Sequence, residues 1–449
     1  SHAPSFSAPS WTTILTGAWP DINDGQPMNP PSHAARAFTQ DDVFAAANRN
    51  GLNTAVSGYI WFHGMLAGSG VDAEFVTPRE DHAADRAVVD AALPWLESGA
   101  YRFVLVHLDQ VDYAGHYQGG PRDPRWNEAA ARADALLGEI AAALDLEQDT
   151  LLVFSDHGQI DAGGHGGPEP VTLLQPFVMA GAAVQPGEYP DIQQVDIAPT
   201  IAVLLGTNIP ASNQGHPLTD MLVLDPQREQ AIRESLAAQQ AGLFEAYTTA
   251  VGQSAVLAED ADVVTATQSA MTQARAGRMA RERVWRNVLA VFLAIFPPYL
   301  FFYMRREKKA LWAFAGGLVT TGLFHLRYAV LDGNTYGFSS TPGQMEFILY
   351  IGVTTAVATV LGWLVSMFGL RAFRQAPPQA AGSALGFAWA AIYFAALPVL
   401  VHFAVDGVLV GWTLPEPWTF FLALISLMQI VGAAAGGLIL VGVSAGVAG

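Results

Sequence analysis

The chain has 449 residues, of which 51% are hydrophobic and only 14% are charged, and because soluble domains carry about 25% charged residues, we expect part of it to lie in lipid. Residues 1–262 carry ten basic and 34 acidic residues and no lysine, so this acidic part is a poor candidate for nucleic-acid binding, which needs clusters of cations. No cysteine is present, which excludes disulfides, thiolate metal sites and a cysteine nucleophile.

The first half of the chain alternates short apolar runs with helical patterns. Four runs are typical of buried strands: residues 53–60, 102–108, 150–154 and 173–179. Three stretches are predicted helices: residues 41–50, 126–144 and 195–205. Thr39 is the expected cap of the first helix, while Gly51 and Gly206 are the expected stop signals of the first and the last.

Strands that alternate with helices predict an α/β fold, with a mostly parallel sheet flanked by helices. In such sheets the chemistry lies in loops beyond the carboxyl ends of the strands. We assign this fold to a catalytic domain of residues 1–225. Residues 226–286 are rich in Ala, Gln and Glu, and we expect them to form a helical connector.

Five apolar runs follow the connector, in residues 288–304, 310–326, 347–370, 384–410 and 418–443. A membrane span needs about 20 apolar residues. We therefore expect residues 287–449 to form an all-α transmembrane bundle of about five helices. His325, His402 and Asp406 lie within or at the end of these runs. Ionisable groups inside a membrane are functional candidates, although near a helix end they can also reach the interface.

The cations between the runs predict the orientation, because cytoplasmic loops carry an excess of Lys and Arg. Residues 305–309 and 371–374 hold six such cations, Arg306 among them. This pattern predicts an integral protein of the plasma membrane with an extracytoplasmic catalytic domain. Five arginines before the first run oppose the pattern, and we interpret them as part of an amphipathic helix on anionic headgroups: Arg275, Arg278, Arg281, Arg283 and Arg286. An inverted topology is the alternative.

Four segments of the first half gather polar side chains where strands are expected to end. Residues 4–17 contain serines beside prolines, Asp112 and His116 form a D-x3-H pattern in a glycine-containing loop, and His165 stands among four glycines. Asp156 and His157 emerge from a buried strand, which is costly unless they are paired or bound to metal. Each segment alone is more typical of a turn, but together two Asp and three His supply zinc-type ligands for two ions.

At these motifs the first half resembles the alkaline phosphatase superfamily, in its type I phosphodiesterase/nucleotide pyrophosphatase branch. Within that branch it is most similar to the glycosylphosphatidylinositol ethanolamine-phosphate transferases and their bacterial relatives. The resemblance covers nearly all of residues 1–220, and a multi-span second half also resembles the transferases. It rests on five motifs: PSFSAPSWTTILTG (4–17), VDYAGH (111–116), SDHGQ (155–159), GGHGG (163–167) and QVDIAPTIAVLLGTNIP (194–210).

The resemblance implies two divalent metal ions, with zinc expected and manganese as the alternative. One ion would be held by Asp112, His116 and His165. The other would be held by Asp156 and His157 together with Ser7, which fills the nucleophile position.

Asn29 is the candidate for the residue that binds the substrate phosphate in relatives. Relatives also use an aspartate from a strand upstream of the nucleophile, and no residue ahead of Ser7 can be that aspartate. We therefore expect either that the N-terminal strand is missing or that the second metal site is incomplete.

The implied chemistry is an in-line displacement, with the two ions about 4 Å apart at the attacking and leaving oxygens. The expected function is a membrane-anchored phosphoryl-transfer enzyme that acts on a phosphodiester, with a lipid-linked substrate as one option, through a phosphoserine intermediate. Water as the acceptor gives a phosphodiesterase, and an alcohol gives a phosphoethanolamine-type transferase; the motifs leave this choice, the head group and the oligomeric state open.

Two other functions stay open at this stage. If the chain is complete, the absent upstream aspartate favours a catalytically degenerate membrane protein with a binding or structural role. A sulfatase-like hydrolase is the second alternative, but sulfatases need x-Pro-x-Arg after the residue that becomes formylglycine. Trp11 stands here where that arginine is required.

Overall fold

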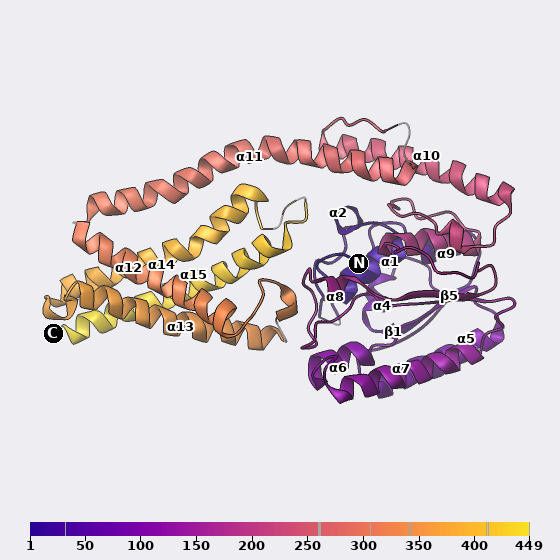
Figure 1. Ribbon diagram of the computed structural model, residues 1–449, viewed down its shortest axis with the longest axis horizontal. Helices are drawn as coiled ribbons and strands as arrows, with labels where there is room; N and C mark the ends of the chain where they lie inside the picture. The colour runs from indigo at the N-terminus through magenta and orange to yellow at the C-terminus, as the bar shows by residue number, and fades with distance from the viewer. Residues whose placement is uncertain are drawn as a thin grey trace. The chain divides into compact units, whose positions relative to one another are not determined.

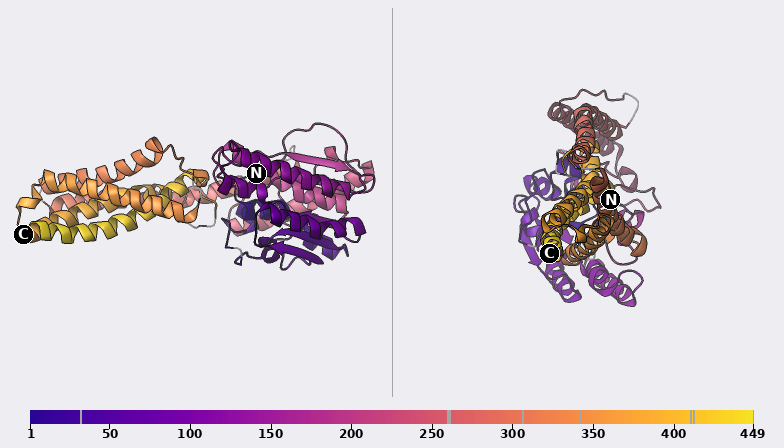
Figure 2. Two further views of the ribbon diagram at one scale, coloured as in Figure 1. Left: turned by 90° about the horizontal axis from the view of Figure 1, so that it is seen from below. Right: turned by 90° about the vertical axis from the view of Figure 1, so that its left-hand side faces the viewer.

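The computed structural model describes residues 1–31, 33–258, 262–305, 307–340, 343–409, 411 and 413–448. It divides the chain into two compact units, Ser1–Arg278 and Met279–Gly449, which Figures 1 and 2 both draw. The loop cation Arg306 and Val410, the predicted end of the fourth apolar run, lie outside the described residues.

The first unit contains a parallel three-stranded sheet in the order β2–β1–β3 and a separate antiparallel pair, β4–β5. The strands are β1 (Thr54–Tyr59), β2 (Ala73–Thr77), β3 (Phe103–Val106), β4 (Thr150–Phe154) and β5 (Phe177–Gly181). The predicted α/β class with a parallel sheet is confirmed. The predicted strand at 173–179 begins late, because Pro170 starts the short helix α8 (Pro170–Leu173).

Helices cover both faces of the parallel sheet. The helices of the first unit include α1 (Ser7–Thr16), α2 (Pro20–Asn23), α3 (Val43–Arg49), α4 (Trp61–Met65), α5 (His82–Ser98), α6 (Gln110–Gln118), α7 (Pro124–Ala142), α9 (Ile197–Leu205) and α10 (Pro226–Val251). On one side, side chains of α1, α3 and α9 pack with β1 into the main core; on the other, α5 and α7 pack against the strands (Figure 1).

Two local predictions in this unit are wrong. Asp42, not Thr39, caps α3, because its carboxylate accepts hydrogen bonds from the backbone N–H groups of Phe44 and Ala45. Asp112 and His116 lie on α6 rather than in a loop. Their spacing of four residues places both side chains on one face of that helix.

The second unit is helical. It contains the later part of α11 (Val263–Met304) and all of α12 (Glu307–His325), α13 (Gln344–Gly369), α14 (Pro377–Val405) and α15 (Pro417–Val447). Among the described residues, four helices are long and apolar enough to cross a membrane, namely α11, α13, α14 and α15. The predicted C-terminal membrane region is therefore confirmed. The apolar part of α12 is shorter, since two lysines begin it and His325 ends it.

The predicted connector, residues 226–286, is largely helical. Its first part, α10, packs within the first unit, where the Gln240 amide donates to the carbonyl of Asn213 at 2.8 Å. The five arginines do not form one exposed face. Arg275 pairs with Asp21, Arg283 donates to the carbonyl of Val405, and Arg286 is 3% exposed.

Candidate active site

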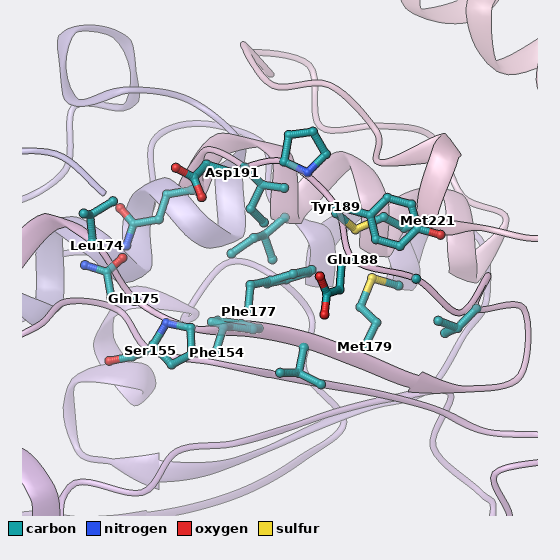
Figure 3. A pocket seen from close by; sticks show the side chains of 18 of the residues that line it. Phe154, Ser155, Leu174, Gln175, Phe177, Met179, Glu188, Tyr189, Asp191 and Met221 are labelled. Atoms are coloured by element: carbon teal, nitrogen blue, oxygen red, sulfur yellow. The ribbon is translucent and has the colours of Figure 1, made fainter.

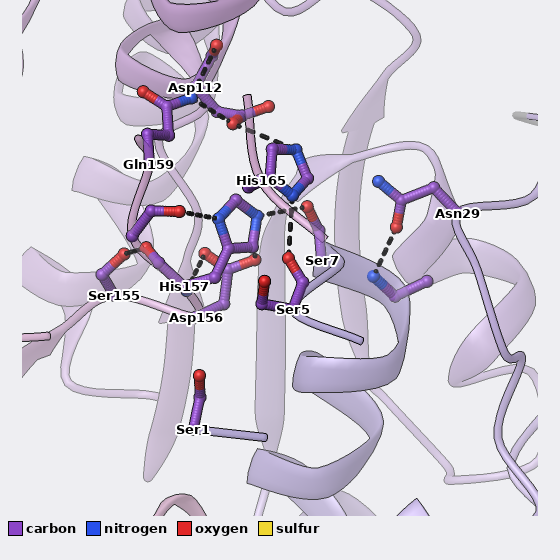
Figure 4. A network of polar contacts seen from close by, with 12 residues as sticks. Ser1, Ser5, Ser7, Asn29, Asp112, Ser155, Asp156, His157, Gln159 and His165 are labelled. Carbon is purple, nitrogen blue, oxygen red and sulfur yellow. Dashed lines mark hydrogen bonds and ion pairs between the residues drawn. The ribbon is translucent and has the colours of Figure 1, made fainter. Parts of the chain in front are cut away.

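The polar side chains singled out from the sequence come together in the first unit (Figure 4). Ser7 is the first residue of α1, and Asp112 and His116 lie on α6, which follows β3. Asp156 and His157 follow β4 directly. The site thus lies beyond the carboxyl ends of β3 and β4, where α/β sheets carry their chemistry.

Asp112, His116 and His165 form a compact set of ligand atoms. Asp112 Oδ2 lies 3.3 Å from His116 Nε2, and His165 Nε2 lies 2.9 Å from His116 Nε2 and 3.5 Å from Asp112 Oδ1. All the ligand atoms fall within 4.8 Å of one another. Tetrahedral zinc ligands at ordinary bond lengths stand roughly 3.3 Å apart. The donor set and its spacing therefore fit one metal ion.

The protonation of this set also suits a metal. Burial, with the nearby His157, lowers the pKa of His165 to about 4, so its ring is neutral at pH 7. Burial alone would raise the pKa of the Asp112 carboxyl, but His165 and His116 lower it below its usual value. Two imidazole nitrogens face each other at 2.9 Å beside an ionised carboxylate. Asp112 raises the pKa of His116, so a metal ion that binds this set would displace a proton from the His116 ring and then meet three lone pairs.

The loop that carries His165 is built to orient it. His165 Nδ1 lies 2.8 Å from the carbonyl of Ser5, so donation there turns the lone pair of Nε2 toward Asp112 and His116. Gly163 has φ of +92°, and a Cβ atom there would come within 1.9 Å of the carbonyl oxygen of Gly115. Only glycine can bring this loop so close to α6.

A second set of donors adjoins the first. His157 Nε2 lies 3.1 Å from Ser7 Oγ and 3.6 Å from Asp156 Oδ2. The His157 and His165 rings are stacked, with their centroids 3.9 Å apart. Within the described part of the chain, the Asp112 set is the one group of three or more His, Asp or Glu ligands in such proximity. The second set is a pair of such ligands supplemented by a serine hydroxyl.

Asn29 lies beside the N-terminus of α1. Its Oδ1 accepts a hydrogen bond of 2.9 Å from the backbone N–H of Ala8. This bond fixes the side chain and leaves the amide Nδ2 as a donor next to Ser7. The position suits contact with a phosphate oxygen.

Sequence reasoning missed the role of Gln159. Its Nε2 donates to Asp112 Oδ1 at 2.6 Å, and its Oε1 accepts from Trp126 Nε1 at 2.9 Å. Gln159 therefore holds the Asp112 carboxylate in place. It is the last residue of the SDHGQ motif, but neighbouring sequence alone does not reveal a contact with a residue 47 positions earlier.

A cavity of about 450 Å³ lies behind the second set. Figure 3 shows Phe154, Phe177 and Met179 along it. Its lining includes two residues that support the Asp156–His157 turn. Ser155 Oγ donates to the carbonyl of His157 at 2.6 Å, and Gln194 Nε2 donates to that of Asp156 at 2.5 Å.

Comparison with known proteins agrees with this geometry. Residues 1–167 match the family described as type I phosphodiesterase/nucleotide pyrophosphatase. GPI ethanolamine phosphate transferase 3, catalytic subunit, is 28% identical over 217 residues in Mus musculus and 27% identical over 217 residues in Homo sapiens. Each of these matches covers 46% of this chain and 19% of the relative.

A third relative gives the same picture. GPI ethanolamine phosphate transferase 2, catalytic subunit, from Homo sapiens is 25% identical over 244 residues, which are 51% of this chain and 24% of the relative. The chain thus spans about a fifth to a quarter of the length of these relatives. The resemblance that the five motifs predicted is confirmed: the N-terminal part of the chain, over residues 1–167, matches the type I phosphodiesterase/nucleotide pyrophosphatase family.

Proposed function

We propose that the chain is a metal-dependent phosphoryl-transfer enzyme of the membrane, which acts on a lipid-linked phosphodiester through a phosphoserine intermediate on Ser7. The observation that carries the proposal is the convergence of two donor sets on one serine. The Asp112 set has its ligand atoms within 4.8 Å of one another, and His157 of the second set lies 3.1 Å from Ser7 Oγ.

Ser7 is the nucleophile in this proposal. A serine hydroxyl is weakly nucleophilic at neutral pH and needs activation. Divalent ions bound at the two sets would supply positive charge to the attacking oxygen and to the substrate phosphate. Ser7 Oγ attacks phosphorus, the bond to the leaving alcohol breaks, and the serine proton passes to that alcohol. The phosphate then remains esterified to Ser7 and to the other alcohol of the diester.

The other site residues hold the reactants. Asp112, His116 and His165 hold one ion, which we propose to be zinc, while Asp156 and His157 contribute to the second. Asn29 Nδ2 donates to a phosphate oxygen. Gln159 keeps Asp112 oriented, because it is anchored in turn by Trp126. Transfer of the phosphoryl group to water or to a second alcohol then completes the reaction.

The membrane helices support a lipid-linked substrate. The described residues include four helices that are long and apolar enough to cross a bilayer, and the relatives above are named GPI ethanolamine phosphate transferases. We propose a phosphoethanolamine-type transfer, at the plasma membrane, with the first unit outside the cytoplasm. Protease added to intact cells should then cleave the first unit, and its protection would reverse the orientation.

The experiment that tests the function combines metal analysis with a substrate panel. The purified full chain should contain divalent metal, and it should cleave or transfer phosphoethanolamine from phosphodiester lipids. Chelation should abolish turnover and zinc should restore it. Ser7→Ala should abolish turnover with unchanged metal content, and Ser10→Ala serves as the matched control on α1. Turnover that survives both chelation and Ser7→Ala would overturn the proposal.

A further inference from the structure

The helices of the second unit bury polar side chains that the proposed reaction does not use. The following have a hydrogen-bonding atom with no partner among the described residues: Thr321, Thr355, Thr359, Ser366, Ser426 and Gln429. Inside a bilayer no bulk water can reach such atoms, and an unsatisfied polar group there is costly. Each of these atoms therefore needs a hydrogen-bonding partner.

A small cavity lies among α12, α13, α14 and α15, and three of these orphan atoms belong to its lining. They are Thr321 Oγ1 on α12, Thr355 Oγ1 on α13 and Gln429 Nε2 on α15. The space open to the centre of a water molecule is about 10 Å³. A cavity needs about that much room, and two to four polar partners, to hold one water.

The cavity is deep in the bundle. Thr355 and Gln429 are 2% and 3% exposed, and both lie near the middle of helices of membrane-spanning length. The rest of the lining is apolar except for Thr320, whose hydroxyl already donates to the carbonyl of Gly316 at 3.1 Å. Neither lipid nor a neighbouring backbone group is therefore in place to satisfy the three orphan atoms.

The methyl group of Thr355 packs between α13 and α15. A Cβ atom added at Gly432 of α15 would lie 3.0 Å from Thr355 Cγ2. The methyl group thus fills the space that the glycine leaves. Thr355 lines the cavity, and its hydroxyl has no hydrogen-bond partner among the described residues.

We propose that this cavity binds one water molecule, which bridges Thr321, Thr355 and Gln429 and so links α12, α13 and α15. The water accepts a hydrogen bond from Gln429 Nε2 and exchanges hydrogen bonds with the two hydroxyls. Three partners are what a buried water typically has. Water fits better than a cation, because the lining within the described residues contains no carboxylate.

The test relies on whether one substitution lowers or raises the unfolding temperature. Thr355→Val keeps the shape of the side chain and removes the hydroxyl. If a water is bound, the change leaves its other partners poorly satisfied, and thermal unfolding of the full chain in nanodiscs should fall by about 2–4 °C. If the cavity is dry, the change removes an orphan hydroxyl, and the unfolding temperature should stay or rise, which would overturn the proposal.

Thr359→Val is the matched control. Thr359 lies one turn further along α13, is 1% exposed and also has an unpartnered hydroxyl, but it does not line the cavity. Its replacement should leave the unfolding temperature unchanged or higher. An equal fall in both variants would show that loss of any threonine on this helix face destabilises the bundle, and it would contradict a specific water site.

Two further measurements keep the proposal testable if Thr355→Val does not fold. Unfolding of the unmodified chain in sodium chloride and in choline chloride should agree, and stabilisation specific to sodium would assign the cavity to a cation instead. A map that resolves ordered water elsewhere in the bundle should show density within hydrogen-bonding distance of Thr355 Oγ1 and Gln429 Nε2. An empty cavity in that map would overturn the proposal.

Discussion

The two units of this chain both bury polar side chains, but they arrange them in different ways. In the first unit these side chains converge on one place, so that His157 contacts both Ser7 and the ring of His165. In the second unit the buried hydroxyls and amides are spread along several helices, for example Thr355 on α13 and Gln429 on α15. Convergence of charged and nucleophilic groups serves chemistry, whereas dispersed hydroxyls and amides contribute to the packing of helices.

The ionisable residues of the second unit sharpen this contrast. His325 Nδ1 lies 2.8 Å from the hydroxyl of Tyr336, and His402 Nδ1 lies 3.3 Å from Asp406 Oδ2. Asp406 also accepts from the hydroxyl of Thr419 at 2.8 Å. These contacts are local to the ends of α12 and α14, and His402 is 1% exposed, so its ring does not reach the interface. Substitutions in the first unit should therefore change metal content and turnover, and those in the second should change stability alone.

The largest effect is expected from His165→Ala. The variant loses one of three ligands, and even the hydrogen-bonding partners of ligands typically contribute roughly 10–100-fold to metal affinity. Affinity at the Asp112 set should fall by more than about a hundredfold, and turnover should fall with it. Metal titration followed by elemental analysis measures this. His63→Ala is the control, since His63 is exposed and pairs with Glu74; an equal loss there would break the assignment.

Gly163→Ala should disturb the same set through the backbone. A Cβ atom at Gly163 would lie 1.9 Å from the carbonyl oxygen of Gly115, next to His116 in the chain. We expect weaker metal binding and a clear loss of stability, measured by titration and by unfolding. Gly99→Ala is the control for the backbone strain alone, because Gly99 has φ of +61° with no atom near its Cβ position. This variant should lower the free energy of unfolding by only about 1–2 kcal/mol. Similar behaviour of the two variants would contradict the close approach.

Gln159→Leu should have an intermediate effect. The variant removes the hydrogen bond of 2.6 Å to Asp112 Oδ1 and leaves Trp126 Nε1 without its acceptor. Metal affinity should fall by roughly 10–100-fold, the range for partners of ligands. Excess metal should restore most of the turnover, which separates a positioning role from a direct one. In the control Gln148→Leu, an exposed amide bonded to Asp145 is lost, and affinity should not change.

The smallest effect is expected in the second unit. Trp363→Phe removes a buried hydrogen bond of 3.0 Å from Trp363 Nε1 to Ser444 Oγ, which joins α13 to α15. Such bonds between membrane helices contribute roughly 0.6 kcal/mol on average. Unfolding should show a loss of about that size beyond the effect of the smaller ring, and Trp418→Phe gives the comparison because Trp418 is 49% exposed. A change in turnover or metal content would show that the units are coupled.

The sequence predicted the candidate site better than it predicted the elements that carry it. Chemistry restricts residue types at fixed spacings, so Asp112 and His116 were identifiable even though their segment was expected to be a loop. That segment is helical because α6 buries Ala114 and Gly115, which depends on the rest of the fold. Likewise, nothing local in residues 150–181 fixes strand direction, and β4 and β5 pair antiparallel.

In the membrane region the sequence predicted the helices better than it predicted the contacts between them. Its apolar runs predicted helices, because length and hydropathy decide whether a segment can span a bilayer. They did not predict which helix faces pack together, since helices that are apolar all round carry little directional pattern. The contact between Thr355 of α13 and Gly432 of α15 therefore needed the structure. The contacts of Gln159 in the first unit also needed the structure, because its partners Asp112 and Trp126 are distant in sequence.

One measurement tests the central claim most directly. The metal-loaded full chain is mixed with a phosphoethanolamine lipid, quenched with acid within a turnover, and digested for mass spectrometry. The peptide that contains Ser7 should carry the added mass of phosphoethanolamine, the part of the lipid left on Ser7 when the lipid alcohol departs, with Ser5, Ser10 and Thr12 unmodified. The label should be absent after chelation and in Ser7→Ala. Active enzyme that never labels Ser7, or labels another residue in its place, would contradict the account.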